Sequence, residues 1–495
     1  MGKKKPFKIL IIALVLFVIF KVLDNYAAKK VAFYLKSEGV SYADLDISFL
    51  NGNLELTEVF YTKDSLSISA ENIRIEDLSY YKYFSKKEIY LNDFKILNAK
   101  IVGKLIENEV DTVQVDSTKN KELSFVNIDN ISLENIEFAI EKKNNYPLKI
   151  QSLDVSLDDF ELDLNSSEKI PFTLESITSE INHFETTLSE VQDFSIGKIS
   201  ITNNDLVIDS LFVKPTKTRK EYIYFVEKEQ ELLNLFTKKI KVSNFSIEEQ
   251  DSLFLGVDEI VIDETNFDLY LDATVLQHSR KYKNLYSKSL RQLPLKLDVK
   301  TLQINNSKLV YEELTKKENK AGILVFNDLE ANITNINNSY FKEEKMTVAG
   351  IKASFMKDSR LNIKWTFDIN NKEDDFRLNG SLFNLKSEDM SSFLLPTMNV
   401  KVDGAIHKMY FDIEGNNYIS NGKMQMDFED LKLRILDQEK HKKKVLSWLV
   451  NLFVKDESRR GLADAEIKEV KRDQTKSFWN YFWLNIENGL KNSLI

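Results

Sequence analysis

The chain has 495 residues, 43% of them hydrophobic, so a folded protein is expected rather than a disordered one. Its formal net charge of −9 combines 68 basic with 77 acidic residues, without the basic excess that is typical of a nucleic-acid binder. The absence of cysteine excludes disulfides, thiolate metal sites and thiol nucleophiles, and the 4 histidines offer little for acid–base or metal chemistry. We therefore expect no cofactor, no metal site and no enzymatic activity.

The first segment, residues 1–39, is predicted to hold a membrane anchor followed by a juxtamembrane helix. Lysines 3, 4, 5 and 8 precede an apolar run that is shorter than the roughly 20 residues of a spanning helix, unless Lys8 and Lys21 reach the headgroups. A cleaved signal peptide is the alternative, but small residues at a cleavage site are poorly supplied. The lysines predict a cytoplasmic N-terminus. The predicted anchor residues are Ile9, Leu10, Ile11, Ile12, Leu14, Val15, Leu16, Phe17, Val18, Ile19 and Phe20.

A phrase of apolar, any, apolar, any, Asn, any, any, apolar recurs along the chain, at residues 94–101, 131–138, 199–206, 240–247 and 302–309. Alternating apolar residues predict strands that are buried on one face and solvated on the other. Asparagine tolerates a turn or kink, so we expect one or the other where the alternation breaks. The asparagines are Asn98, Asn135, Asn203, Asn244 and Asn306.

The body of the chain, residues 40–436, is predicted to be mainly β. Only two segments, 220–239 and 277–293, show helical spacing, too few to cover a large sheet in a βαβ arrangement. The apolar face must then close on itself as a sandwich or barrel, or remain an open groove that lipid chains cover. Alternation alone does not separate these two readings. The candidate groove-lining residues are Ile199, Ile201, Leu206, Leu302, Ile304, Leu309, Ile363, Trp365 and Phe367.

The last segment, residues 437–495, is predicted to be a basic linker and an amphipathic helical cap. Apolar residues recur every fourth position from residue 478, with two indoles beside them. Such a helix either lies on a membrane surface or caps an open part of the sheet. The amphipathic face comprises Phe478, Trp479, Phe482, Trp483, Ile486 and Leu490.

Adjacent carboxylates occur at residues 158–159, 248–249 and 374–375, and a paired-acid glycosidase site would need such groups. In a chain with 77 acidic residues, we interpret them as solvated charges at turns and strand ends. No glycine-rich phosphate loop and no Gly-x-Ser-x-Gly elbow occurs in the sequence.

Several passages together resemble the AsmA-like family of bacterial envelope proteins, in the form common among Bacteroidetes. They are the Lys-flanked anchor, the early strand text 45–56, the phrase at 302–311, the end of the body at 422–436, residues 449–454, and Arg472, Lys476–Phe478, Tyr481 and Gly489–Leu490. The resemblance implies an inner-membrane anchor and a groove-shaped periplasmic β structure, similar to the repeating β-groove proteins that move lipids between membranes.

We thus expect an elongated, curved antiparallel sheet forming a groove, with an N-terminal transmembrane helix and short C-terminal amphipathic helices. The expected function is that of a single-pass inner-membrane protein, periplasmic in bulk, which holds acyl chains and aids phospholipid transfer or outer-membrane homeostasis. Its expected partners are the inner membrane, a phospholipid or other acyl lipid, and other envelope proteins, with no nucleic acid. The alternative is a scaffold or assembly factor that engages envelope proteins through sheet edges.

Overall fold

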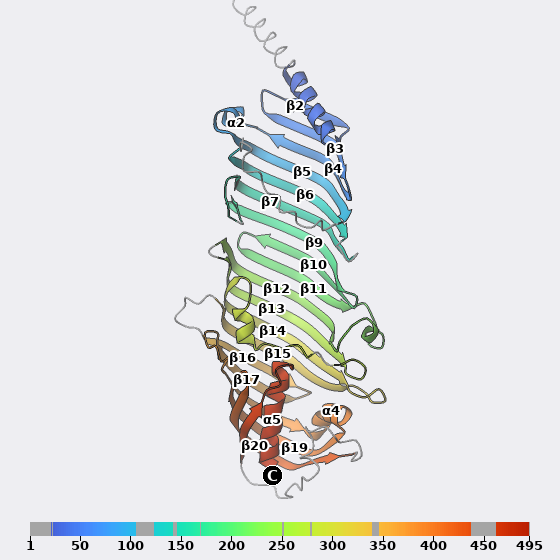
Figure 1. Cartoon of the computed structure of the whole chain (residues 1–495), viewed down its shortest axis with the longest axis vertical. Helices are drawn as coiled ribbons and strands as arrows, with labels where there is room; N and C mark the ends of the chain where they lie inside the picture. The colour runs from blue at the N-terminus through green and yellow to red at the C-terminus, as the bar shows by residue number, and fades with distance from the viewer. Residues whose placement is uncertain are drawn as a thin grey trace, which may run out of the picture. The chain divides into compact units, whose positions relative to one another are not determined.

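The computed structural model describes residues 21, 23–104, 123–141, 146–168, 170–249, 252–277, 280–338, 346–436 and 462–494. Hydrogen bonding assigns its 21 strands to one open, mixed sheet (Figure 1), so the expectation of a mainly β protein is confirmed. The chain divides into two compact units. Unit 1 holds the described residues up to Thr187 together with Ser195–Ile208, and unit 2 holds Leu188–Phe194 and the residues from Asp209 onward.

Short strands and 11- to 17-residue strands form the N-terminal half of the body. The first nine are β1 (Val40–Ser41), β2 (Asp44–Ser48), β3 (Asn53–Lys63), β4 (Leu66–Glu76), β5 (Glu88–Lys104), β6 (Phe125–Glu141), β7 (Pro147–Asp163), β8 (Phe172–Thr173) and β9 (Ser176–Ser189). Strands β10 (Gln192–Thr202) and β11 (Asp205–Pro215) contribute residues to both units. The helix α2 (Tyr80–Lys86) connects β4 to β5.

Unit 2 contains the remaining strands and three α-helices. The strands are β12 (Leu232–Glu249), β13 (Leu253–Asp272), β14 (Lys296–Leu314), β15 (Gly322–Asn337), β16 (Met346–Phe355), β17 (Ser359–Asp368), β18 (Phe376–Lys386), β19 (Val400–Gly415), β20 (Ile419–Ile435) and β21 (Ala463–Lys471). The helices are α3 (Tyr286–Arg291), α4 (Ser387–Met398) and α5 (Phe478–Leu494), with a 3₁₀ turn, η1, at Tyr222–Tyr224.

The predicted anchor, Ile9–Phe20, lies outside the described residues, as does most of the basic linker. Residues 23–37 are helical, in agreement with the predicted juxtamembrane helix. Within the described ranges, no helix is both long and apolar enough to cross a membrane.

The sheet is mixed, which corrects the expectation of a purely antiparallel one. Strands β5 and β6 pair in parallel, and so do β13 and β14. Parallel neighbours require a long crossover instead of a hairpin. The chain supplies one at residues 105–124 and another at residues 273–295. The second crossover contains α3, so the helix expected in 277–293 is present in shortened form.

The helix expected over 220–239 is wrong. Residues 222–224 form only a 3₁₀ turn, and β12 begins at Leu232. Adjacent Leu232 and Leu233 pair with Tyr270 and Leu269 of β13, and this ladder outweighs the helical spacing of the apolar residues.

The asparagine of the recurring phrase marks a turn or a kink, as predicted. Four of the five lie inside a strand, and Asn203 lies in the turn between β10 and β11. All five asparagines have φ between 47° and 55°, the left-handed region that asparagine tolerates better than most residues. In β6 the ladder shifts register on either side of Ile136, next to Asn135. Strict alternation would place Phe138 on the face opposite Leu133. The kink instead lets Leu133, Ile136 and Phe138 pack in one apolar cluster.

Candidate functional site

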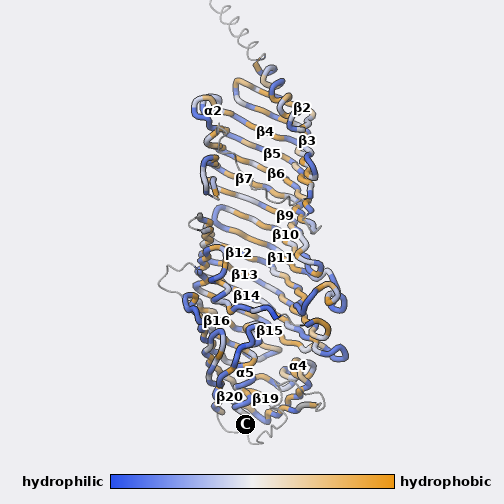
Figure 2. The backbone as a smooth tube through the Cα atoms, in the orientation of Figure 1, coloured by the Kyte–Doolittle hydropathy of each residue, from blue (hydrophilic) through white to orange (hydrophobic). Residues whose placement is uncertain are grey.

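The candidate site is the apolar face of the sheet, which is built from rows of side chains in register on neighbouring strands. Residues directly opposite each other in a ladder have their side chains on the same face. Figure 2 shows apolar and polar positions alternating along the strands. Unit 1 contains two such rows. The first is Leu56, Ile73, Ile96, Leu133 and Val155. The second is Leu54, Ile75, Phe94, Ile131, Leu157 and Ile177.

Residues that alternate with apolar positions on the same strands carry cross-strand ion pairs. Lys95 Nζ lies 2.5 Å from Glu134 Oε1, and Lys100 Nζ lies 2.9 Å from Glu137 Oε2. The Lys95 ammonium, through its hydrogen bond, lowers the pKa of Glu134. These side chains are largely solvated, so each pair adds little stability. They show which face of the sheet is solvated.

Most side chains of the unit 1 rows are half-buried. The cluster around Leu56, Val59, Ala70, Ala99 and Ile136 receives Leu35 from the helix at residues 23–37. Helix α2 buries none of its residues. Among the described residues of unit 1, therefore, one short helix covers the first strands, and the later strands bear no helix over their apolar face. The predicted lining residues Ile199, Ile201 and Leu206 lie here, on β10 and β11, and are half-buried.

Unit 2 continues the same construction over ten strands. Its predicted lining residues Leu302 and Ile304 lie on two neighbouring rows, and Leu309 lies on a shorter one with Phe267 and Phe326. The first row is Val242, Ile260, Leu302, Ile333, Ala349, Trp365, Leu378, Ile413, Gly422 and Ile467. The second is Ile240, Ile262, Ile304, Ala331, Ile351, Ile363, Gly380, Phe411, Met424 and Ala465. Neither row contains a charged residue.

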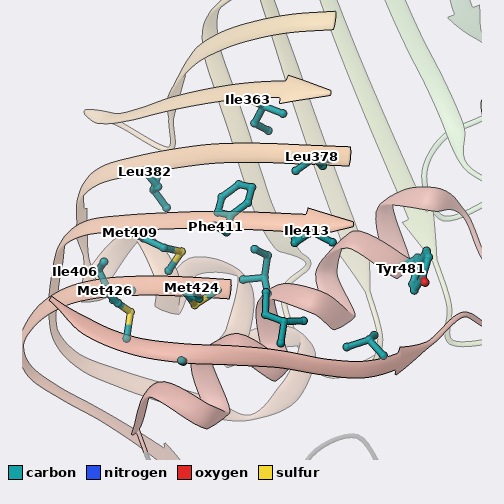
Figure 3. Close-up of a cluster of buried hydrophobic side chains, with 14 of the residues drawn as sticks. Ile363, Leu378, Leu382, Ile406, Met409, Phe411, Ile413, Met424, Met426 and Tyr481 are labelled. Atoms are coloured by element: carbon teal, nitrogen blue, oxygen red, sulfur yellow. The ribbon is translucent and has the colours of Figure 1, made fainter. Parts of the chain in front are cut away.

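At the C-terminal end of unit 2 the rows enter a closed core (Figure 3). Ile413, Met424 and Met426 are fully buried there, and Tyr481 of α5 is 1% exposed. Helix α5 packs against β20 and β21, and its apolar face supplies Phe478, Phe482, Ile486 and Leu490 to this core. Trp483 is half-buried, whereas Trp479 remains 47% exposed. Of the two interpretations of this amphipathic helix, a membrane-surface helix or a cap on the sheet, its packing in this structure is that of a cap.

The boundary between the uncovered rows and the closed core is aromatic. The rings of Trp365 and Phe478 stack with 4.8 Å between their centroids and an interplanar angle of 16°. The ring centroid of Tyr286 in α3 lies 5.1 Å from that of Trp365. The predicted lining residues Ile363, Trp365 and Phe367 lie at this boundary and contact protein side chains. A ligand on these three residues would have to displace α3 and α5.

Buried polar contacts hold the 273–295 crossover to the core. Arg291 donates to Asp374 at 2.5 Å and to the carbonyls of Ile369 and Asn371. Asp374 is 3% exposed, so the interpretation of this carboxylate as a solvated turn charge is wrong. Nothing in the local sequence marks it, because its partner lies far away along the chain.

Arg472 makes the second contact to the crossover. Its guanidinium donates to the carbonyl of Lys283 and to the side chain of Asn417, and burial lowers its pKa. The sequence indicated Arg472 only as part of a resemblance. The structure gives it a role, which is to tie the crossover to the turn that precedes α5.

Helix α5 also blocks the hydrogen-bonding edge of β21. The amide of Lys468 donates to Asn488 Oδ1 at 3.0 Å, and Asn492 donates to the carbonyl of Glu466 at 2.6 Å. The exposed positions of β21 are mostly charged. Such an edge offers little template for an added strand.

A cavity of about 410 Å³ lies in unit 2, lined by polar residues that include Lys214, Lys217, Arg219 and Asp268 and by apolar residues that include Leu232. The Arg219 guanidinium is already paired within the protein, since both of its terminal nitrogens donate to the Glu312 carboxylate. Within the part of the chain that the structure describes, no three histidine or acidic side chains are grouped so that they could hold a metal ion.

No protein-family model matches this chain, and no curated protein matches it. The resemblance to AsmA-like proteins therefore stays a prediction from the sequence.

Proposed function

We propose that the protein is a membrane-anchored carrier that holds lipid acyl chains against the apolar face of its sheet. The observation that carries this proposal is the set of uncharged apolar rows that run from strand to strand within each unit. Burial of acyl chains there would stabilise bound lipid by roughly 0.8 kcal/mol per CH₂ group. Rows that repeat with every strand offer successive, similar positions, so a lipid can shift along them.

The face favours lipid over a polar ligand for two reasons. First, the rows present no charge, and the ion pairs of the same strands lie on the opposite face. Second, an apolar face of this extent would be unfavourable in water without a covering layer. In unit 2 the protein provides part of that layer itself, with α5 and α3, whereas the described residues of unit 1 provide one short helix.

The place of action is proposed from the sequence. The lysine-flanked apolar run at residues 9–20 predicts an inner-membrane anchor, and the positive-inside rule then puts the sheet in the periplasm. The resemblance to AsmA-like proteins supports the same arrangement and suggests a role in phospholipid transfer or outer-membrane homeostasis. The scaffold alternative gains no support at β21, because α5 occupies that edge.

Site-specific photocrosslinking of the full chain in its membrane tests the proposal. We would replace Leu133 of unit 1, and separately Leu302 of unit 2, with p-benzoylphenylalanine and identify adducts by mass spectrometry. The matched controls are the adjacent positions Ser132 and Gln303, which face the other way. We expect phospholipid adducts at the two leucine positions and few at the controls. Equal labelling at all four positions, or protein adducts alone, would overturn the proposal.

A further inference from the structure

The N-terminal corner of unit 1 joins three segments that are separate in the sequence. These are the start of the 23–37 helix, the turn at residues 49–52 and α2. The amide of Phe49 donates to Asp24 Oδ1 at 2.6 Å, and the ring of Phe49 stacks on Tyr80 at 4.8 Å. The amide of Leu78 donates to the carbonyl of Gly52 at 3.0 Å. In Figure 1, α2 and this helix lie at the same end of unit 1.

Glycine is required at position 52 of this corner. Its φ is +70°, and a Cβ atom there would lie 2.5 Å from the Leu78 carbonyl oxygen. The close approach keeps the 49–52 turn against the start of α2, so the corner is a fixed surface.

The corner exposes large apolar side chains that the fold does not use. Leu50 is 60% exposed, Tyr81 is 75% exposed and Phe84 is 70% exposed. Scattered apolar side chains are normal on a surface, but here they gather on one short helix and the adjoining turn. Lysines 82, 86 and 87 belong to the same helix and its C-cap, and Lys82 Nζ lies 3.2 Å from the centre of the Tyr90 ring.

The predicted anchor, which directly precedes the 23–37 helix in the sequence, indicates what would contact this surface. Asp24, which binds the 49–52 turn, is four residues after Phe20, where the predicted anchor ends. Four residues of chain span at most about 14 Å even when fully extended, so Asp24 lies close to the end of that run. Tyrosine and tryptophan are enriched at the headgroup level of a bilayer, and lysine serves as an interfacial anchor there.

We propose that α2 and the 49–52 turn rest on the bilayer surface, with Leu50, Tyr81 and Phe84 in the interfacial layer and the lysines near lipid phosphates. The partner is a phospholipid bilayer. This contact goes beyond acyl-chain carriage and does not depend on it, although it does depend on the predicted anchor. Such docking would orient the first strands of unit 1 at the membrane surface.

Spin labelling of the full chain in phosphatidylethanolamine–phosphatidylglycerol vesicles tests the proposal, because the chain has no cysteine. Single-cysteine variants Leu50→Cys and Phe84→Cys would be labelled, and collision with oxygen would be compared with collision with a water-soluble nickel chelate. The matched control is Phe172→Cys, an exposed apolar position of unit 1. Phe172 lies on β8, which is three strand spacings, or about 14 Å, from β5. The control position is therefore farther from the proposed membrane contact.

We expect the oxygen-to-nickel collision ratio at positions 50 and 84 to exceed that at position 172 several-fold. Equal ratios at all three positions would overturn the docking proposal. A fourth variant, Ile12→Cys, separates the causes of such a failure. A label at position 12 within the bilayer would leave the anchor standing and reject the docked surface alone, whereas a label in water would reject the anchor and the docking together. Neither result depends on whether acyl chains bind the sheet.

Discussion

The apolar face is completed differently at the N-terminal strands of unit 1 and at the C-terminal strands of unit 2. Around Leu133, an apolar row is half-buried among its neighbours, with Leu35 as the helical contribution to its cluster. Around Leu378, which is 1% exposed, the row is covered by α5. The strand patterns are alike, so alternation determines which face is apolar but not what covers it. The covering layer comes from segments outside the repeat.

The largest expected effect comes from truncating one leucine in each region. Leu378→Ala leaves a cavity in a packed core and should lower the free energy of unfolding by about 2–5 kcal/mol. Leu133→Ala removes a side chain that is still partly solvated and should cost less than half as much. Urea unfolding with peptide-resolved hydrogen exchange would assign each loss to its unit. Equal losses in the two variants would contradict the proposed difference in covering.

The kinks should behave alike in both units, since they depend on the backbone and not on the covering layer. Asn306→Val places a β-branched residue at a φ of 47° and should cost about 1–2 kcal/mol. Asn135→Val should cost at least as much, because it also removes the hydrogen bond to Asn98 Oδ1. Urea midpoints provide the measurement. Glycine at either position is the control, and a glycine variant as unstable as the valine variant would refute the backbone explanation.

The smallest effect concerns alkaline pH and one tyrosine of the covered core. Burial raises the pKa of Tyr481 from 10 to about 12. A folded-state pKa above the unfolded value gives stability that is complete below pH 10 and is lost as pH rises toward 12. Tyr481→Phe should therefore flatten the decline of thermal midpoint between pH 10 and pH 12. Tyr418→Phe, at a side chain that is 60% exposed, is the matched control. An unchanged slope in Tyr481→Phe would contradict this assignment.

Local pattern was sufficient to predict the strands, a turn or kink at each of the five asparagines, and the amphipathic face of α5. The parallel pairs could not be predicted from local pattern, because the pairing of β5 with β6 depends on where the long connection between them returns to the sheet. The spacing around Leu232 and Leu233 does not distinguish a helix from the strand that forms, since a run of adjacent apolar residues fits a buried strand as well as a helix. The burial of Asp374 could not be foreseen, because it requires Arg291 from a different strand connection.

Helix α5 also has a consequence for the order in which the protein can mature. Strands β17 to β20 are made, and on the proposed route cross the inner membrane, before residues 478–494, so the side chains around Met424 have no covering layer during that interval. Newly made chains that expose such surfaces are aggregation-prone and are typical clients of chaperones. The strands of unit 1 face no such delay, since residues 23–37 emerge before β1. Folding of the nascent chain should therefore proceed from the N-terminal strands, with the C-terminal core as the step most exposed to failure.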